Sequence, residues 1–256
     1  MAEHTSLAGQ LCSRLGAGGF VRPDPFDLVV STVADHDAGW ANHDADPELD
    51  QATGLPVGLF SAPLGISLAV AAASPTLHEA RHPLAGLLVS MHSTGLYAGG
   101  WGLDRQALID RLDPSARPAI ESMLAYEAER RERLIQVLGV DKSLRSLAQP
   151  DAVMANYRCL QFCDSLALWL QVGEPHERTG GCFEALVDPG GRHVPIAVTP
   201  IRTDVVELDP WPFLGADVEV ECRSRLIETQ PDRVGLRRAL SEAPPHVERI
   251  ELRPGG

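Results

Sequence analysis

The hydrophobic pattern of the chain changes once, near Gly173, and this change constrains the fold more than any other feature. Before it, apolar residues recur at helical spacing or fill long runs, as in Glu3–Leu15 and Phe26–Ala34. After it, paired glycines separate short runs rich in β-branched residues, which is typical of strands joined by turns. We therefore predict a mainly α protein, with a helical domain over residues 1–172 and a small antiparallel β appendage over residues 173–256.

Several segments are predicted to be helices from their periodicity or continuous apolar character. They are Glu3–Leu15, Phe26–Ala34, Ala62–Ala73, Leu84–Tyr97, Asp104–Gly139 (with a break at Pro114-Ser115) and Ala152–Val172. The polar stretch Asn42–Pro56 contains Asp, Pro and Gly throughout and is predicted to be a loop. The predicted strands are Cys182–Val187, Val194–Ile201, Asp204–Leu208, Val218–Cys222 and Val247–Leu252.

Charge and composition indicate which kinds of molecule the protein binds. With 35 acidic and 22 basic residues the net charge is -13, so a nucleic-acid-binding surface is not expected. The most apolar stretch, Leu64–Ala73, is too short to span a bilayer, and the N-terminus lacks the pattern of a signal peptide. The scattered cysteines indicate buried thiols in a reducing compartment. We expect a cytoplasmic protein that meets neither membranes nor nucleic acid and binds a small-molecule substrate, with a homodimer left open.

The pair His36-Asp37 follows the apolar run Phe26–Ala34 directly. This run is too densely apolar for a surface strand and suits a buried helix that carries the two side chains to the interior. An imidazole and a carboxylate that reach one point suit a divalent metal such as Zn, Mn or Fe. For the dipeptide alone, a surface acidic turn is the commoner explanation, so the interpretation depends on the rest of the chain.

Other residues gain interest from their surroundings. Asp164 lies in the middle of an apolar helix, where a carboxylate must be paired or bound to a metal. His92 lies in a nearly continuous apolar helix and must be hydrogen-bonded or ligate a metal. His4 stands near the start of the first helix, where a solvated residue is the commoner case. We expect less burial of His78 and His82, which lie on a short connection.

Substrate contacts are expected beside the His36-Asp37 pair, because loops next to a metal site often carry them. Trp40, His43 and Asp44 are the candidates, although solvated loop residues remain the default for the last two. The acidic chain has no Gly-rich phosphate loop. Arg14, Arg81 and Arg158 are therefore the arginines considered for a phosphate group, with surface solvation the commoner role of each.

The order of His4, His36-Asp37 and Asp164 resembles that of the HD superfamily of metal-dependent phosphohydrolases. This resemblance implies an HD-domain-like helical bundle in which these residues ligate one metal ion. It also implies that a further histidine, here His92, can recruit a second ion, which Asp37 would bridge. Wider stretches resemble a bacterial family of unknown function: His4–Leu11, His36–Trp40, Leu87–His92, Asp164–Leu168 and Pro210–Phe213.

The resemblance gives a first hypothesis of function and two alternatives. The first is a hydrolase in which one or two divalent ions (Mn, Zn, Mg or Fe) activate water against a small phosphorylated metabolite or nucleotide. Asp37 and His92 would be its catalytic residues. The second is an HD-type di-iron oxygenase, and the third is a non-catalytic metal- or ligand-binding protein. Fold resemblance alone does not decide among them.

Overall fold

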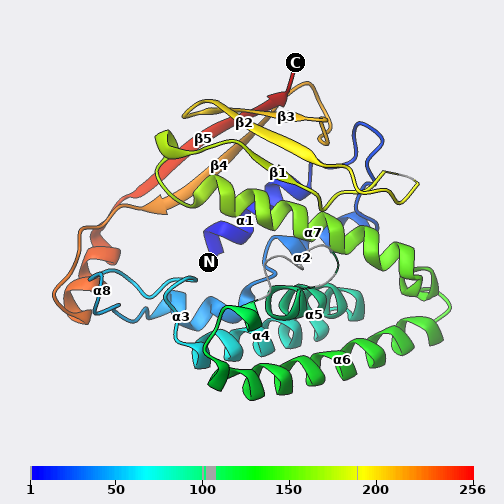
Figure 1. The fold of residues 1–256 in the computed structure, drawn as a ribbon, viewed down its shortest axis with the longest axis horizontal. Coiled ribbons are helices and arrows are strands. Elements are labelled where there is room, and N and C mark those ends of the chain that lie inside the picture. The colour runs from blue at the N-terminus through cyan, green and yellow to red at the C-terminus, as the bar shows by residue number, and fades with distance from the viewer. Residues whose placement is uncertain (1, 100, 102–107, 189) are drawn as a thin grey trace.

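The computed structural model describes residues 2–99, 101, 108–188 and 190–256 (Figure 1). The predicted helix start at Asp104 lies outside the described residues. The α-helices are α1 Ala2–Cys12, α2 Phe26–Val33, α3 Ala41–Ala45, α4 Leu64–Glu79, α5 Pro83–Ala98, α6 Arg117–Val140, α7 Pro150–Gln171 and α8 Arg233–Glu242. Short 3-10 helices are η1 Ala38–Trp40, η3 Leu108–Asp110, η4 Pro114–Ala116, η5 Arg145–Ala148 and η6 Pro175–Glu177.

The strands form one five-stranded sheet in the order β1-β2-β3-β5-β4. Their bounds are β1 Gly181–Phe183, β2 Ile196–Arg202, β3 Val205–Asp209, β4 Val218–Arg225 and β5 Pro245–Pro254. Most neighbouring strands are antiparallel, but β3 and β5 run parallel, with Val206 opposite Leu252. The last strand thus enters the sheet between β3 and β4, after a connection that contains α8 (Figure 1).

The predicted fold class is therefore wrong. About half of the chain is helical, and the strands form a mixed, curled sheet instead of a small antiparallel appendage on a mainly α bundle. The physical reason is that residue patterns locate strands but do not specify their neighbours, and the parallel β3–β5 pair depends on a long-range return of the chain. Helix α8 was not predicted from the sequence. It is largely polar, and Leu236 is the only buried residue among its described residues.

The sheet and the helices share a hydrophobic core. Figure 1 shows α1 and α7 between the sheet and the group formed by α2, α4, α5 and α6. Leu7 from α1, Leu166 from α7 and Val220 from β4 are all fully or almost fully buried in the same cluster. Helix α1 packs on both α7 and β4, so the site-bearing helices are fixed against the sheet. The division into residues 1–172 and 173–256 stays a prediction.

Helix α4 is longer than its hydrophobic pattern predicts. The sequence indicates an end near Ala73, before Pro75, because proline removes a helical hydrogen bond and crowds the preceding turn. In the structure α4 continues through Pro75, which is buried, to Glu79. The extra turn places His78 inside the protein. Within the described residues, no helix combines the length and apolar character needed to cross a membrane.

Candidate metal centre

The turn that follows α2 carries His36 into the interior, where its side chain is completely buried. Nδ1 of His36 lies 2.9 Å from the carbonyl oxygen of Val33, one turn back. Because a carbonyl oxygen can only accept, Nδ1 donates, and in the neutral ring the lone pair stays on Nε2. A backbone hydrogen bond of this kind fixes the ring orientation of many metal-ligating histidines.

Asp164, on α7, lies between two histidines. Its Oδ1 is 2.8 Å from Nε2 of His4 on α1 and 3.2 Å from Nε2 of His36. The other ring nitrogen of His4 lies 3.2 Å from Oε1 of Gln171, two turns further along α7. His4, His36 and Asp164 are all buried, because α1 packs along α7 at this point. The firm docking of α1 keeps His4 in place despite its position near the N-terminus.

Asp37 and His92 complete the group on its other side. The His92 ring, on α5, lies 4.8 Å from the His36 ring between centroids, and Asp37 Oδ2 is 3.8 Å from His36 Nε2. Two sets of candidate ligand atoms therefore share His36, and within each set the atoms lie within 4.8 Å of one another. We call these five residues the donor cluster: His4, His36, Asp37, His92 and Asp164.

The charges within the donor cluster are strongly coupled. Burial opposes the charged form of His36, but the carboxylates of Asp37 and Asp164 favour it more and raise its pKa from 6.5 to about 9. Burial also opposes ionisation of Asp164, yet His36 and His4 hold its pKa well below the ordinary value. The pKa of His92 is lowered, mainly by burial. The neutral His92 ring therefore keeps one nitrogen lone pair for a ligand.

The donor cluster fits a divalent transition metal. Nε2 of His36 and Nδ1 of His92 are buried and have no hydrogen-bond partner in the described part of the chain. A buried lone pair that faces two carboxylates is unfavourable unless a proton or a cation lies between them. Imidazole nitrogens and carboxylate oxygens in this number suit Zn, Mn or Fe.

A cavity of about 390 Å³ opens beside the donor cluster. His4, Asp37, His92 and Asp164 line it, whereas the completely buried His36 does not. The rest of the lining comes from α4, α5, α7, η1 and the segments 59–62 and 108–112. A substrate in this cavity would therefore contact the cluster through Asp37, His92 and their neighbours.

The structure separates the predicted substrate-binding residues. Trp40 is buried and lines the cavity. His43 packs edge-on against Trp40, with ring centroids 5.7 Å apart, but does not line the cavity. Asp44 is exposed, and its Oδ2 accepts a hydrogen bond from the backbone N–H of Ala2 at 3.1 Å. It therefore holds the start of α1, the helix that carries His4.

None of the arginines that the sequence suggested lines the cavity. Arg14 is exposed, Arg81 pairs with Asp35, and Arg158 is buried against Gln161 and the carbonyl oxygen of Trp101. Arg111 does line the cavity. Sequence reasoning missed it, because neither its spacing nor its surroundings distinguish it from other surface arginines.

A second group, which we call the closed cluster, lies next to the donor cluster and extends from the interior to the surface. It consists of Asp35, His78 and Arg81, with the carbonyl oxygen of Ser74. His78 is completely buried, so the expectation that it would be less buried is wrong. The physical reason is the extension of α4 past Pro75. Nε2 of His78 lies 2.8 Å from Asp35 Oδ1, and its Nδ1 lies 2.8 Å from the Ser74 carbonyl oxygen.

Gly39 lets η1 pack closely on α4. A Cβ at this position would lie 2.7 Å from both the Ser74 hydroxyl oxygen and the Val70 carbonyl oxygen. The N–H of Gly39 instead donates to the Ser74 hydroxyl at 3.0 Å. This contact explains the glycine of the sequence His36-Asp37-Ala38-Gly39-Trp40, and it places Trp40 on the cavity wall.

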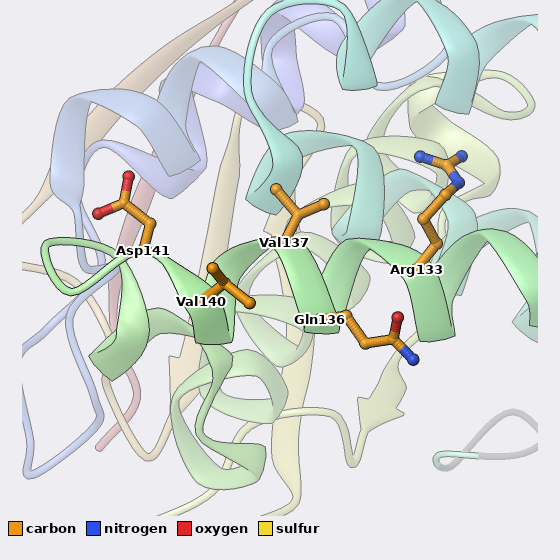
Figure 2. A pocket seen from close by; sticks show the side chains of 5 residues that line it. All are labelled: Arg133, Gln136, Val137, Val140 and Asp141. Carbon is orange, nitrogen blue, oxygen red and sulfur yellow. The ribbon is translucent and has the colours of Figure 1, made fainter.

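A separate hollow lies along the outer face of α6. Figure 2 shows the side chains that line it, which are Arg133, Gln136, Val137, Val140 and Asp141. Val140 is 81% exposed, and the described residues that line the hollow include no histidine or cysteine. It offers no group of converging donors, so the cavity beside the donor cluster is the better candidate for chemistry.

Comparison with known proteins agrees with the family-level resemblance. No curated protein and no solved structure matches the chain. The family model described as "Protein of unknown function (DUF3891)" matches residues 1–229, which include the whole donor cluster. The chain therefore belongs to the DUF3891 family.

Proposed function

We propose that this protein is a metal-dependent hydrolase that cleaves the phosphoester bond of a small molecule. The observation that carries the proposal is the convergence on Nε2 of the buried His36, which faces Asp164 Oδ1 at 3.2 Å and Asp37 Oδ2 at 3.8 Å without a well-directed hydrogen bond to a described residue. The cavity beside the donor cluster gives a substrate access to the other four donors, which are His4, Asp37, His92 and Asp164. The order of the donors along the chain also resembles that of the HD phosphohydrolases.

The residues divide by their position around His36. His36 is completely enclosed, and His4 and Asp164 lie together on one side of it, so these three would provide the fixed ligands. The Asp37 side chain is 16% exposed and lines the cavity, so it could both help to hold a divalent ion and orient a reacting water. A divalent ion in such a site lowers the pKa of bound water and stabilises charge on a phosphoryl oxygen.

Asp37 and His92 are the groups best placed to move protons. Both line the cavity, and both lie beside His36. Neutral His92 can accept a proton, while a carboxylate at Asp37 can orient water by accepting its hydrogen bond. If a second ion binds, the same two side chains would be its ligands, which leaves proton transfer to water.

The test measures bound metal and phosphate release together. Purified protein is analysed by mass spectrometry for metal and is assayed with 4-nitrophenyl phosphate, beside the variants Asp164→Asn and Asp151→Asn. Both substitutions change one aspartate of α7, but Asp151 is exposed in the first turn of that helix. We expect Asp164→Asn to lose metal and activity and Asp151→Asn to keep both.

Two results would contradict the proposal. Folded wild-type protein that binds no Zn, Mn, Mg or Fe after reconstitution would leave the donor cluster without a metal role. Bound iron with oxygen consumption, and no phosphate release, would replace hydrolysis by the oxygenase alternative.

A further inference from the structure

The walls of the cavity are apolar immediately beside the donor cluster. Leu168 lies one helical turn after Asp164 on α7, and Leu96 lies one turn after His92 on α5. Val70 and Leu64 face the same space from α4. A bound molecule whose reacting group meets the donors would thus place its remaining atoms against aliphatic side chains.

Apolar residues outnumber polar ones in the described lining, and two of its hydroxyls already have protein partners. The Ser74 hydroxyl accepts a hydrogen bond from the Gly39 N–H at 3.0 Å, and the Ser67 hydroxyl donates to the Pro63 carbonyl oxygen at 3.5 Å. Outside the donor cluster, Arg111 is the only charged residue among the described residues that line the cavity. A nucleobase or sugar needs several converging donors and acceptors, and these walls provide few.

We propose that the substrate is a phosphate monoester of an apolar alcohol, with an aliphatic chain or an aromatic ring beyond the ester oxygen. This inference rests on the proposed phosphohydrolase function. An apolar cavity of about 150 Å³ binds benzene, so the cavity of about 390 Å³ has room for a longer chain or a second ring. The phosphoryl group meets the donor cluster, and the apolar part covers Leu168 and Leu96.

The reaction is a hydrolysis in which a water oxygen forms a bond to phosphorus. The bond between phosphorus and the ester oxygen breaks, and its electron pair stays on that oxygen. One proton of the water ends on the leaving alcohol, which gives an uncharged apolar product and inorganic phosphate. The reaction needs no other co-reactant.

The test separates binding of the apolar part from catalysis. Alkylphosphonates from methyl to octyl, whose carbon–phosphorus bond is not hydrolysed, are titrated into the metal-loaded protein by calorimetry. The corresponding alkyl phosphates are assayed for phosphate release. Each methylene that enters an apolar site contributes about 0.8 kcal/mol, so we expect affinity to rise about threefold to fourfold per carbon until the cavity is full.

Two variants change the cavity wall, one by its polarity and one by its size, and a third substitution outside the cavity is the control. Leu168→Gln introduces a polar group and should flatten the rise, whereas Leu226→Gln, the same change at a side chain that is 71% exposed and outside the cavity, should not. Ser67→Phe fills part of the space and should stop the rise at a shorter chain.

The outcomes distinguish this inference from the proposed function. A flat series in the wild type, with methyl phosphate still hydrolysed, would overturn the apolar substrate and leave the hydrolase. A rise in affinity with no hydrolysis of any alkyl phosphate would overturn the hydrolase and with it the substrate assignment. Equal effects of Leu168→Gln and Leu226→Gln would also overturn the inference, since the cavity wall would then not be the binding surface.

Discussion

Two clusters, each built on a fully buried histidine and a carboxylate, lie side by side, and their histidines differ in one respect. In the closed cluster, both ring nitrogens of His78 have acceptors, the carboxylate of Asp35 and the carbonyl oxygen of Ser74. In the donor cluster, His92 Nδ1 has no hydrogen-bond partner among the described residues, and His36 Nε2 lies 3.2 Å from Asp164 Oδ1 without a well-directed hydrogen bond. Buried polar atoms are normally satisfied, so two unpartnered ring nitrogens beside two carboxylates are available to a ligand. Hydrogen-bond satisfaction, rather than residue type, thus separates a structural cluster from a candidate site.

The largest expected difference between the clusters is in metal binding. His36→Gln removes a ligand nitrogen and should lower metal affinity by more than about 100-fold. Loss of a residue that only hydrogen-bonds to a metal ligand already lowers affinity by up to about 100-fold. His78→Gln should leave the metal content of the purified protein unchanged. Both are measured by mass spectrometry and by competition with a chelator. Equal loss of metal in the two variants would show that the clusters act as one unit.

The next effect concerns the stability of metal-free protein between pH 6.5 and 9. The folded protein raises the pKa of His36 from 6.5 to about 9, because Asp37 and Asp164 outweigh the cost of burial. The stabilisation is fully present below pH 6.5 and is lost as pH rises through about 9. It amounts to about 3 kcal/mol at most. Denaturant unfolding of chelator-treated protein at several pH values measures it.

The variant His36→Gln provides the control for this pH dependence, because it removes the titrating ring. Its stability should change much less across the same range. Bound metal should also remove the effect, since the metal takes the place of the proton on Nε2 and its binding strengthens as pH rises. A wild-type curve that stays flat in metal-free protein would contradict the assigned coupling.

The sequence predicted the helices around the site better than it predicted the sheet. Long apolar runs located α2, α5 and α7, because burial on all sides leaves a strong local pattern. The parallel β3–β5 pair has no local signal, since it depends on which strand the chain returns to. Helix α8 is polar over most of its surface, so its apolar content could not reveal it.

The donor cluster was predictable because several weak signals agreed. Asp164 and His92 stood out as polar residues in apolar helices, His36-Asp37 stood out as a pair that follows an apolar run, and the family resemblance added His4. His78 was missed because Pro75 suggested that α4 ends before it. His43 and Asp44 are near in sequence but lie outside the cavity, since proximity along a loop does not set the direction of a side chain.

Within the closed cluster, the buried histidine should matter for stability. Replacing His78 by Gln leaves the half-buried carboxylate of Asp35 with a poorer partner and a space in the interior. We expect the free energy of unfolding to fall by about 1–3 kcal/mol, as measured by urea denaturation at neutral pH. Leu77→Gln, a substitution on the exposed side of the same helix α4, is the control. A polar residue such as Asn156 would not serve as a control, because its side chain holds the backbone of Asp24 by hydrogen bonds.

Arg81 should contribute least, although it also pairs with Asp35. Its side chain is 55% exposed, and exposed ion pairs contribute less than about 1 kcal/mol because water and salt screen them. Arg81→Met should therefore destabilise the protein by less than His78→Gln, and the difference from wild type should shrink further in 0.5 M salt. An Arg81→Met effect equal to that of His78→Gln would mean that the arginine, not the buried ring, holds Asp35. The closed cluster would then depend on its exposed edge, and the contrast with the fully enclosed His36 would sharpen.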